Sequence, residues 1–319
     1  MGELTVRVAR VHDEAIDVRS FELRAADGGS LPSYAPGSHV DVHVAPGIVR
    51  QYSLCGDPRE SDRYLIAVKR EPASRGGSVA MHERVNEGTT LRIGAPRNNF
   101  ALAAGASHHL LVAGGIGITP ILAMARHLLA AGASFQLVYF SRSIAHTAFH
   151  GLLSGPGYAG RVTFHYALEP EQVRAYLRKL LWLRAEGAHL YLCGPKPFVD
   201  LVETMSTPTW PPDAVHVEHF AADPASLAGP RDSFVVKLAR HGGEFTIPEG
   251  RSIIEVLAEH GVAVETSCEQ GVCGTCVTGV LEGEPDHRDI FFTEAEKRAN
   301  DRMTVCVSRA KSARLVLDL

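Results

Sequence analysis

Ser267-Cys268-Glu269-Gln270-Gly271-Val272-Cys273-Gly274-Thr275-Cys276 is the stretch that decides how the C-terminal part of this 319-residue chain folds. Its three cysteines have the spacing C-x4-C-x2-C, and a fourth cysteine, Cys306, follows in a separate segment. The short stretch must wrap tightly if all three thiols are to reach one inorganic centre. We therefore expect a loop here that is closed from the other side by Cys306.

This spacing is typical of the ligands of a plant-type 2Fe–2S centre. Two bridging sulfides supply half of the iron ligands, and four cysteine thiolates complete the centre. Gly271 and Gly274 allow backbone N–H groups to approach the sulfurs and tune the potential. Zinc is the alternative, but zinc sites favour paired C-x2-C knuckles, and here one half would be the lone Cys306. The predicted cluster ligands are Cys268, Cys273, Cys276 and Cys306.

The bulk composition is that of an ordinary globular protein. The chain is 45% hydrophobic and 21% charged, with a net charge of −4, which gives no reason to expect a nucleic-acid partner. The N-terminus has no long apolar run, so it does not predict a secretory signal. No apolar run elsewhere approaches the roughly 18 residues of a membrane helix. We therefore expect a cytoplasmic protein, whose thiols ligate metal rather than form disulfides. Without a long apolar seam, we expect a monomer.

Residues 1–103 are predicted to form a small antiparallel β-barrel. Short stretches of alternating apolar and polar residues recur here at close spacing, which is typical of such barrels. The expected strands are Leu4–Val11, Arg19–Arg24, Val40–Val44 and Tyr64–Lys69.

Residues 104–223 change character and predict a doubly wound parallel sheet. The apolar run before Gly114 is followed by a helical pattern at Pro120–Ala131 and a strand at Phe135–Phe140. Further helices are expected at Glu171–Ala185 and Pro197–Thr204. Alternation of strands and helices implies parallel strands covered by helices.

The last part is predicted to be a linker at 224–232 and a ferredoxin domain of the β-grasp type at 233–319. The linker residues are small, polar and rich in Pro and Gly. Ser252, with Glu255 three residues later, is the expected N-terminal capping box of a helix. Leu315–Leu319 is the expected final strand.

Five cysteines and histidines outside the cluster set have simple structural explanations. Cys55 and Cys193 are expected to pack as small hydrophobic residues. His39 belongs to an alternating strand and is expected on its solvated face. The adjacent His108 and His109 are expected in a solvated turn before a strand.

The first part carries a candidate flavin site. In Arg50-Gln51-Tyr52-Ser53, an arginine can pair with a phosphate, a tyrosine can stack on an isoalloxazine ring and a serine can bond the flavin near N5. Gly76 and Gly77 open a helix whose N-terminus can hold a phosphate. Each motif alone also describes a simple turn, so the flavin hypothesis depends on their order along the chain.

The second part carries a candidate nicotinamide site. Glycines between a strand and a helix let a pyrophosphate approach the backbone and the helix N-terminus. An arginine after the next strand can accept the 2′-phosphate of NADP, whereas an acidic residue there would favour NAD. No acidic residue is nearby, so these residues alone leave the choice of cosubstrate open. The expected dinucleotide contacts are Gly114, Gly115, Gly117, Ser141, Arg142, Cys193, Gly194 and Pro195.

Taken together, these motifs resemble those of the phthalate dioxygenase reductase family, the reductase components of Rieske-type oxygenases such as vanillate demethylase. The resemblance runs over essentially the whole chain and in the same order: flavin, nicotinamide, ferredoxin. It includes R-x-Y-S-L-C from Arg50, V-A-G-G-I-G-I-T-P from Val112, C-G-P from Cys193, E-x-F from Glu218, and the cysteine set.

The resemblance implies FMN as the flavin and NADH as the electron donor. It places Phe220 beside the flavin face that the nicotinamide approaches, and Cys193 along the nicotinamide path. The acidic residue that follows this arginine in phthalate dioxygenase reductase is Ser143 here, so NADPH stays open. The implied FMN contacts are Arg50, Tyr52, Ser53, Ala67, Val68, Lys69, Gly76, Gly77, Ser78, Thr119 and Phe220.

The resemblance also implies the activity. A hydride would pass from NADH to FMN, and single electrons would pass through the cluster to a separate Rieske-type terminal oxygenase, with no side chain acting as acid, base or nucleophile. One alternative is a stand-alone NAD(P)H flavin reductase or diaphorase that serves free acceptors. A zinc-bearing scaffold and a self-contained hydroxylase are further alternatives. The identity of the oxygenase and its organic substrate is not encoded in these motifs.

Overall fold

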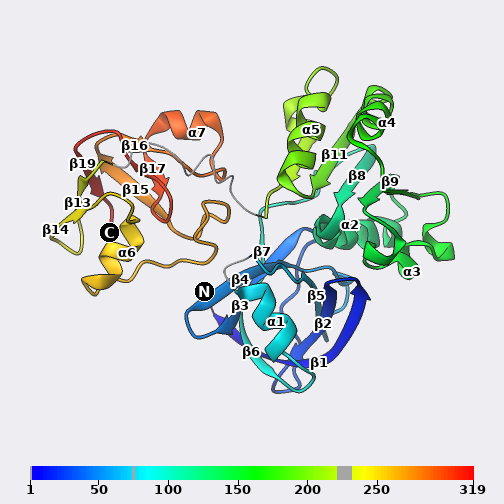
Figure 1. Cartoon of the computed structure of the whole chain (residues 1–319), viewed down its shortest axis with the longest axis horizontal. Helices are drawn as coiled ribbons and strands as arrows, with labels where there is room; N and C mark the ends of the chain where they lie inside the picture. Colours follow the sequence, from blue (N-terminus) through cyan, green and yellow to red (C-terminus); the bar gives the residue numbers. More distant parts are fainter. Residues whose placement is uncertain (1, 74–75, 221–231) are drawn as a thin grey trace. The chain divides into compact units, whose positions relative to one another are not determined.

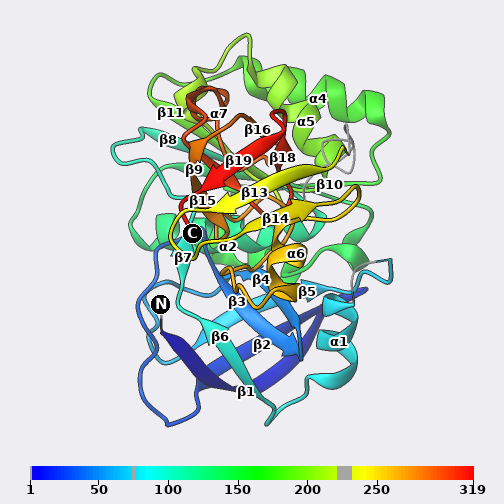
Figure 2. The ribbon, with the colours of Figure 1, turned by 90° about the vertical axis from the view of Figure 1, so that its left-hand side faces the viewer.

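The computed structural model describes residues 2–73, 76–220 and 232–319 (Figures 1 and 2). The chain divides into two compact units, Met1–Glu218 and His219–Leu319. The predicted linker 224–232 lies outside the described residues, apart from Asp232. Within the described residues, no helix is both long and apolar enough to span a bilayer.

The first unit begins with an antiparallel seven-stranded sheet in the order β4-β3-β6-β1-β2-β5, with β7 paired to β3. Leu54 forms an isolated bridge with Ile66 of β5, so the sheet curls back on itself as the predicted barrel. Its elements are β1 (Glu3–Ala15), β2 (Val18–Ala25), β3 (Ser38–Ala45), β4 (Ile48–Ser53), β5 (Tyr64–Lys69), α1 (Gly77–Arg84), β6 (Thr90–Gly94) and β7 (Arg97–Asn98).

The alternation of β3 fills the barrel with side chains from one face of the strand. Val40 and Val42 are fully buried in the barrel core. The opposite face was expected to be solvated, but His39, which lies on it, is only 4% exposed. β7 pairs with β3 beside His39, and Arg97 of β7 forms an ion pair with Asp41 at 2.7 Å. Burial first, and then the charge of Arg97, lower the pKa of His39 to about 4.

The first unit continues as a parallel sheet in the order β10-β9-β8-β11-β12. This order confirms the doubly wound fold. Its elements are β8 (His108–Gly114), η1 (Gly115–Gly117), α2 (Ile118–Ala130), β9 (Phe135–Ser141), η2 (Ile144–His146), α3 (His150–Leu153), η3 (Pro156–Tyr158), β10 (Val162–Tyr166), α4 (Pro170–Trp182), β11 (Ala188–Cys193), α5 (Lys196–Ser206), η4 (Pro212–Ala214) and β12 (Val215–Glu218).

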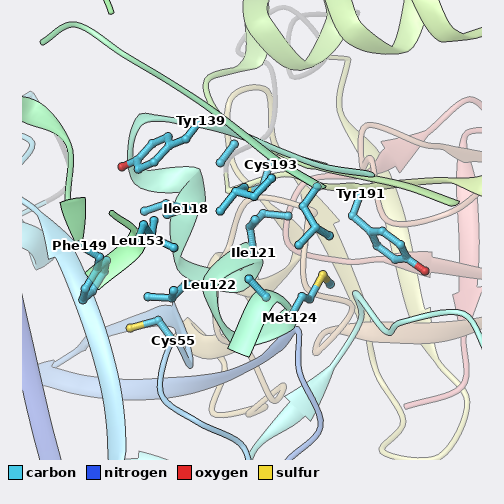
Figure 3. Packing of buried hydrophobic residues seen from close by; sticks show 14 of the residues in the cluster. Cys55, Ile118, Ile121, Leu122, Met124, Tyr139, Phe149, Leu153, Tyr191 and Cys193 are labelled. Atoms are coloured by element: carbon cyan, nitrogen blue, oxygen red, sulfur yellow. The ribbon is translucent and has the colours of Figure 1, made fainter. Parts of the chain in front are cut away.

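Helices cover both faces of this sheet. Leu177 of α4 and Val199 of α5 pack on one face. On the other face, α2 lies between the sheet and the barrel, so that Leu122 shares a core with Tyr139 of the sheet and Cys55 of the barrel (Figure 3). This arrangement explains why α2 is buried on nearly all sides.

Both cysteines outside the cluster set pack as predicted, whereas the histidine pair does not lie in a turn. Cys55 and Cys193 are fully buried in the core of Figure 3. His108 and His109 are the first residues of β8, and His109 is 6% exposed. The pairing of β8 with β11 already begins at His108, so both histidines belong to the strand that continues into the apolar run.

The second unit is a mixed sheet in the order β14-β13-β19-β15-β17, with a small β16–β18 ladder. The capping box of Ser252 and Glu255 is present at the start of α6, as predicted. The elements are β13 (Phe234–Leu238), β14 (Glu244–Ile247), α6 (Ile253–Glu259), β15 (Val277–Glu282), β16 (Pro285–Asp286), α7 (Glu294–Ala299), β17 (Arg302–Thr304), β18 (Arg309–Ala310) and β19 (Arg314–Leu317).

Candidate functional site

The four predicted cluster ligands come together as two pairs. The side chain of Cys268 is hydrogen-bonded to that of Cys273, and the side chain of Cys276 to that of Cys306. All four are buried, with exposures between 3% and 7%. No three His, Cys, Asp or Glu side chains in the described ranges are grouped around a single metal position. Two pairs fit two irons with two cysteine sulfurs each better than they fit one zinc ion.

The loop backbone turns its N–H groups toward these sulfurs. The N–H groups of Gln270 and Thr275 lie 3.3 and 3.4 Å from the sulfurs of Cys268 and Cys273. The Gly271 N–H bonds the sulfur of Cys306. Gly271 has a φ of +70°, which favours glycine, so the expected role of this residue agrees with the backbone.

The thiols of each pair differ in acidity. The hydrogen bond from Cys268 lowers the pKa of Cys273 and raises that of Cys268 itself. In the second pair, the hydrogen bond between the two side chains lowers the pKa of Cys276 and raises that of Cys306. A cluster needs all four as thiolates, and the iron charge together with the loop N–H groups would favour that state.

The predicted flavin residues of the barrel gather around the start of α1. A Cβ on Gly77 would lie 2.4 Å from Cγ of Arg50, so only glycine lets this side chain cross the helix N-terminus. The hydroxyl of Tyr52 is buried and has no hydrogen-bond partner among the described residues, and burial raises the pKa of Tyr52. An arginine at a helix N-terminus beside an orphaned hydroxyl suits a phosphorylated flavin such as FMN.

The other predicted flavin residues lie on neighbouring elements. Lys69 ends β5 and pairs with Glu71 at 2.9 Å. The Ser78 hydroxyl accepts the backbone N–H of Glu71 at 3.1 Å. Ser53, Ala67 and Val68 are buried, and Gly76 takes a φ of +82° as the N-cap of α1.

The barrel meets the nucleotide sheet at the predicted glycine turn. The turn η1 contacts β5, the strand that carries Ala67, Val68 and Lys69. Thr119, in the first turn of α2, is 2% exposed and donates to the carbonyl of Ile116 at 3.1 Å. The flavin and nicotinamide candidates are therefore neighbours within one unit.

The predicted nicotinamide glycines pack against each other across the sheet edge. A Cβ on Gly117 would lie 2.2 Å from the carbonyl oxygen of Cys193, and one on Gly194 would lie 3.2 Å from Cα of Gly114. Gly115 has a φ of +52° and open space beside it. These residues end β8 and β11, between which the strand order of the sheet reverses. Ligands of doubly wound sheets bind at this switch point.

The remaining nicotinamide candidates lie along the same edge. Pro195 is exposed at the N-cap of α5. Ser141 ends β9 and its hydroxyl lies 2.6 Å from that of Thr147. Arg142 is exposed just beyond it, and the Ser143 hydroxyl lies 2.8 Å from Nδ1 of His146. The edge thus presents one arginine and no acid at the predicted cosubstrate position.

One residue at this edge was not among the predicted site residues. Glu218 ends β12 as the register partner of Cys193. Its Oε2 atom is buried without a hydrogen-bond partner among the described residues. Burial raises the pKa of Glu218 to about 8 and that of Cys193 well above its ordinary value, with a further contribution from Glu218. The sequence signal was present in the motif E-x-F, but it gives no measure of burial.

Phe220, the last predicted flavin contact, is 41% exposed and belongs to the second unit.

Comparison with known proteins agrees with both units. Residues 236–311 match the model of the "2Fe-2S iron-sulfur cluster binding domain". Vanillate O-demethylase oxidoreductase of Pseudomonas putida is 48% identical over 310 residues, covering 97% of each chain. Phthalate dioxygenase reductase of Burkholderia cepacia is 42% identical over 320 residues, covering 100% of this chain and 98% of that one.

A solved structure of phthalate dioxygenase reductase, described as "a modular structure for electron transfer from pyridine nucleotides to [2Fe-2S]", has a TM-score of 0.78. The two chains are 42% identical, and the match covers 100% of this chain and 98% of the solved one. Identity at this level over the full length confirms the resemblance seen in the motifs. The chain belongs to the phthalate dioxygenase reductase family, the oxidoreductase components of oxygenase and demethylase systems.

Proposed function

We propose that this chain takes electrons from NADH and delivers them singly to a Rieske-type terminal oxygenase, with FMN and a 2Fe–2S cluster as its resident groups. The contact of β5 with η1 carries the proposal, because it brings the flavin candidates and the dinucleotide turn together in one compact unit. When bound, FMN converts a two-electron hydride donor into a source of single electrons, and the cluster carries one electron at a time.

The barrel residues would hold the flavin. Arg50, crossing Gly77 at the start of α1, would bind the phosphate together with helix N–H groups. Tyr52 would offer its buried hydroxyl to the flavin while its ring stacks on the isoalloxazine. Ser53 and Thr119 would fix the polar edge of the ring from the barrel and from α2.

The sheet edge would hold the dinucleotide. Gly114, Gly117 and Gly194 let the strand ends pack closely, since a side chain on any of them would meet another residue. Gly115, with open space beside it, would let the backbone approach a pyrophosphate. Arg142 would bind the adenosine ribose end. Cys193 and Glu218 would form the buried wall beside the nicotinamide, and the raised pKa of Glu218 would keep this wall uncharged below pH about 8.

Phe220 and the domain boundaries complete the proposal. Phe220 would cover the flavin until the nicotinamide displaces it. The flavin domain would end near residue 103, the nucleotide domain near 223, and the ferredoxin domain would begin near 233. We further infer that the protein acts as a monomer in the cytosol, where cysteines stay reduced and four of them can hold the cluster.

A direct test is the cofactor content of the purified protein, followed by an anaerobic titration with NADH. We expect one FMN, two irons and two labile sulfides per chain, and loss of both the flavin and the cluster absorbance on reduction. A protein with flavin but no iron would favour the stand-alone flavin reductase. Zinc in place of iron would favour the scaffold alternative.

A further inference from the structure

A buried carboxylate lies behind the cysteine loop of the second unit. The side chain of Asp289 is 0% exposed. Its Oδ2 accepts the backbone N–H of Phe292 at 2.9 Å, and its Oδ1 lies 3.4 Å from both the Ser308 hydroxyl and Nδ1 of His287. Two of these three contacts are long, so the bond from the Phe292 N–H is the strongest hydrogen bond that this side chain accepts.

Asp289 is packed against the loop that carries three of the cysteines. A Cβ on Gly271 would lie 2.9 Å from Cα and 3.0 Å from Cβ of Asp289. The next residue, Ile290, donates its N–H to the carbonyl of Gly271 at 3.1 Å. The N–H of the same glycine bonds the sulfur of Cys306. The Asp289 segment therefore holds the residue whose N–H bonds a predicted iron ligand.

Asp289 also reaches the segment of the fourth cysteine. Ser308, whose hydroxyl lies 3.4 Å from the Asp289 carboxylate, is two residues after Cys306. That hydroxyl lies 3.1 Å from the hydroxyl of Thr304, two residues before Cys306. One carboxylate thus links both sides of the cysteine set.

We propose that Asp289 is a positioning residue that fixes Gly271 against Cys306 and lowers the reduction potential of the cluster. Reduction adds one negative charge to the cluster, and a buried negative charge nearby opposes that addition because protein interiors screen weakly. The hydrogen bonds and charges around ligands are among the means by which a protein tunes a metal centre. This inference rests on the proposed function, since it requires that the four cysteines hold a 2Fe–2S cluster.

The test is a redox titration of the intact protein, followed by the EPR signal of the reduced cluster. Asp289→Asn keeps the shape of the side chain and removes the charge. We expect the equilibrium for reduction to shift by about tenfold toward the reduced cluster, which is about 59 mV upward for one electron. Asp301→Asn removes the same charge from a side chain that is 65% exposed in the same unit, and should leave the equilibrium within about twofold.

Ser308→Ala separates charge from hydrogen bonding. It removes the hydroxyl and keeps the carboxylate, so the potential should stay close to that of the natural chain while the melting temperature falls. If Asp289→Asn does not accumulate with its cluster, Asp289→Ser provides the same measurement with a smaller neutral side chain.

Several results would overturn this inference. An unchanged or lower potential in Asp289→Asn, or a shift equal to that of Asp301→Asn, excludes an effect of the buried charge. Two Asp289 variants that fold but bind no iron would assign this residue a structural role alone. A natural chain with no EPR signal on reduction would remove the proposed function as well, so the two failures are distinguishable.

Discussion

Cys193 and Glu218 are register partners on the parallel strands β11 and β12, and the Glu218 Oε2 atom is buried there without a hydrogen-bond partner among the described residues. Two buried acidic groups at one sheet edge favour their neutral forms, because burial disfavours charge and each charge would repel the other. The buried wall that Cys193 and Glu218 form at the proposed dinucleotide edge is therefore uncharged near neutral pH.

This burial makes stability depend on pH through Glu218. Its pKa in the folded protein, about 8, lies above the ordinary value of 4.5. The stabilisation of the protonated carboxyl is therefore complete below pH about 4.5 and is lost as the pH rises to about 8. We expect Glu218→Gln, which cannot ionise, to gain melting temperature relative to the natural chain over this range.

The measurement is thermal unfolding of both proteins at several pH values. Glu171→Gln is the control, because the Glu171 side chain is 90% exposed and its replacement should give a difference that does not change with pH. If the difference in melting temperature between Glu218→Gln and the natural chain also does not change with pH, folding does not raise the pKa of Glu218.

Gly117→Ala should disable the nucleotide turn. The new Cβ would lie 2.2 Å from the carbonyl oxygen of Cys193, and backbone atoms cannot move aside as a side-chain end can. We expect the rate of flavin reduction at low NADH concentration to fall at least about tenfold, with flavin content kept. Gly151→Ala is the matched control, since nothing lies within 4 Å of the added atom. Equal rates in the two variants would place the dinucleotide elsewhere.

Arg50→Lys should weaken flavin binding. Lysine cannot reproduce the planar fork with which arginine binds phosphate, although the charge is kept. Loss of one charge-assisted hydrogen bond corresponds to about a tenfold higher dissociation constant for FMN. Titration of the deflavinated protein with FMN measures it, and Arg92→Lys, at a side chain that is 62% exposed, serves as control. Unaltered FMN affinity in Arg50→Lys would remove Arg50 from the flavin site.

Much of the fold could be predicted because its signals are local. The capping box of Ser252 and Glu255 identified α6, and glycines after an apolar strand identified the nucleotide turn. The same signal at Thr293 and Glu296 marks α7, which was not predicted, although the sequence contains it. The predicted helix Glu171–Ala185 is too long, because the backbone leaves the helical region at Leu183.

The rest of the site depends on contacts between segments far apart in the chain. Short strands such as β12 give a weak pattern, so the burial of Glu218 could not be predicted. His39 alternates like a solvated residue, yet it is buried where β3 pairs with β7, a short strand far from it in the chain. Asp289 likewise stands in an ordinary polar stretch, and its role appears only where Gly271 packs against it.

Phe291→Ala should shorten the lifetime of the cluster in air. The Phe291 ring is 37% exposed and lies against Gly274, where an added Cβ would meet it at 2.3 Å. Removing the ring opens the cysteine loop to solvent and oxidants. We expect the cluster absorbance to decay several-fold faster, with Leu281→Ala, at a residue that is 56% exposed in the same unit, as control. Equal decay in both variants would show that Phe291 does not protect the loop.

The most direct test of the relay compares Cys276→Ser with the natural chain, each mixed anaerobically with NADH and an oxidised Rieske protein. Cys276 is paired with Cys306 and is 3% exposed, so its replacement removes a predicted iron ligand from the interior. We expect NADH to bleach the flavin in both proteins and the Rieske protein to be reduced only by the natural chain. Reduction of the Rieske protein by Cys276→Ser at the natural rate would contradict the relay through the cluster.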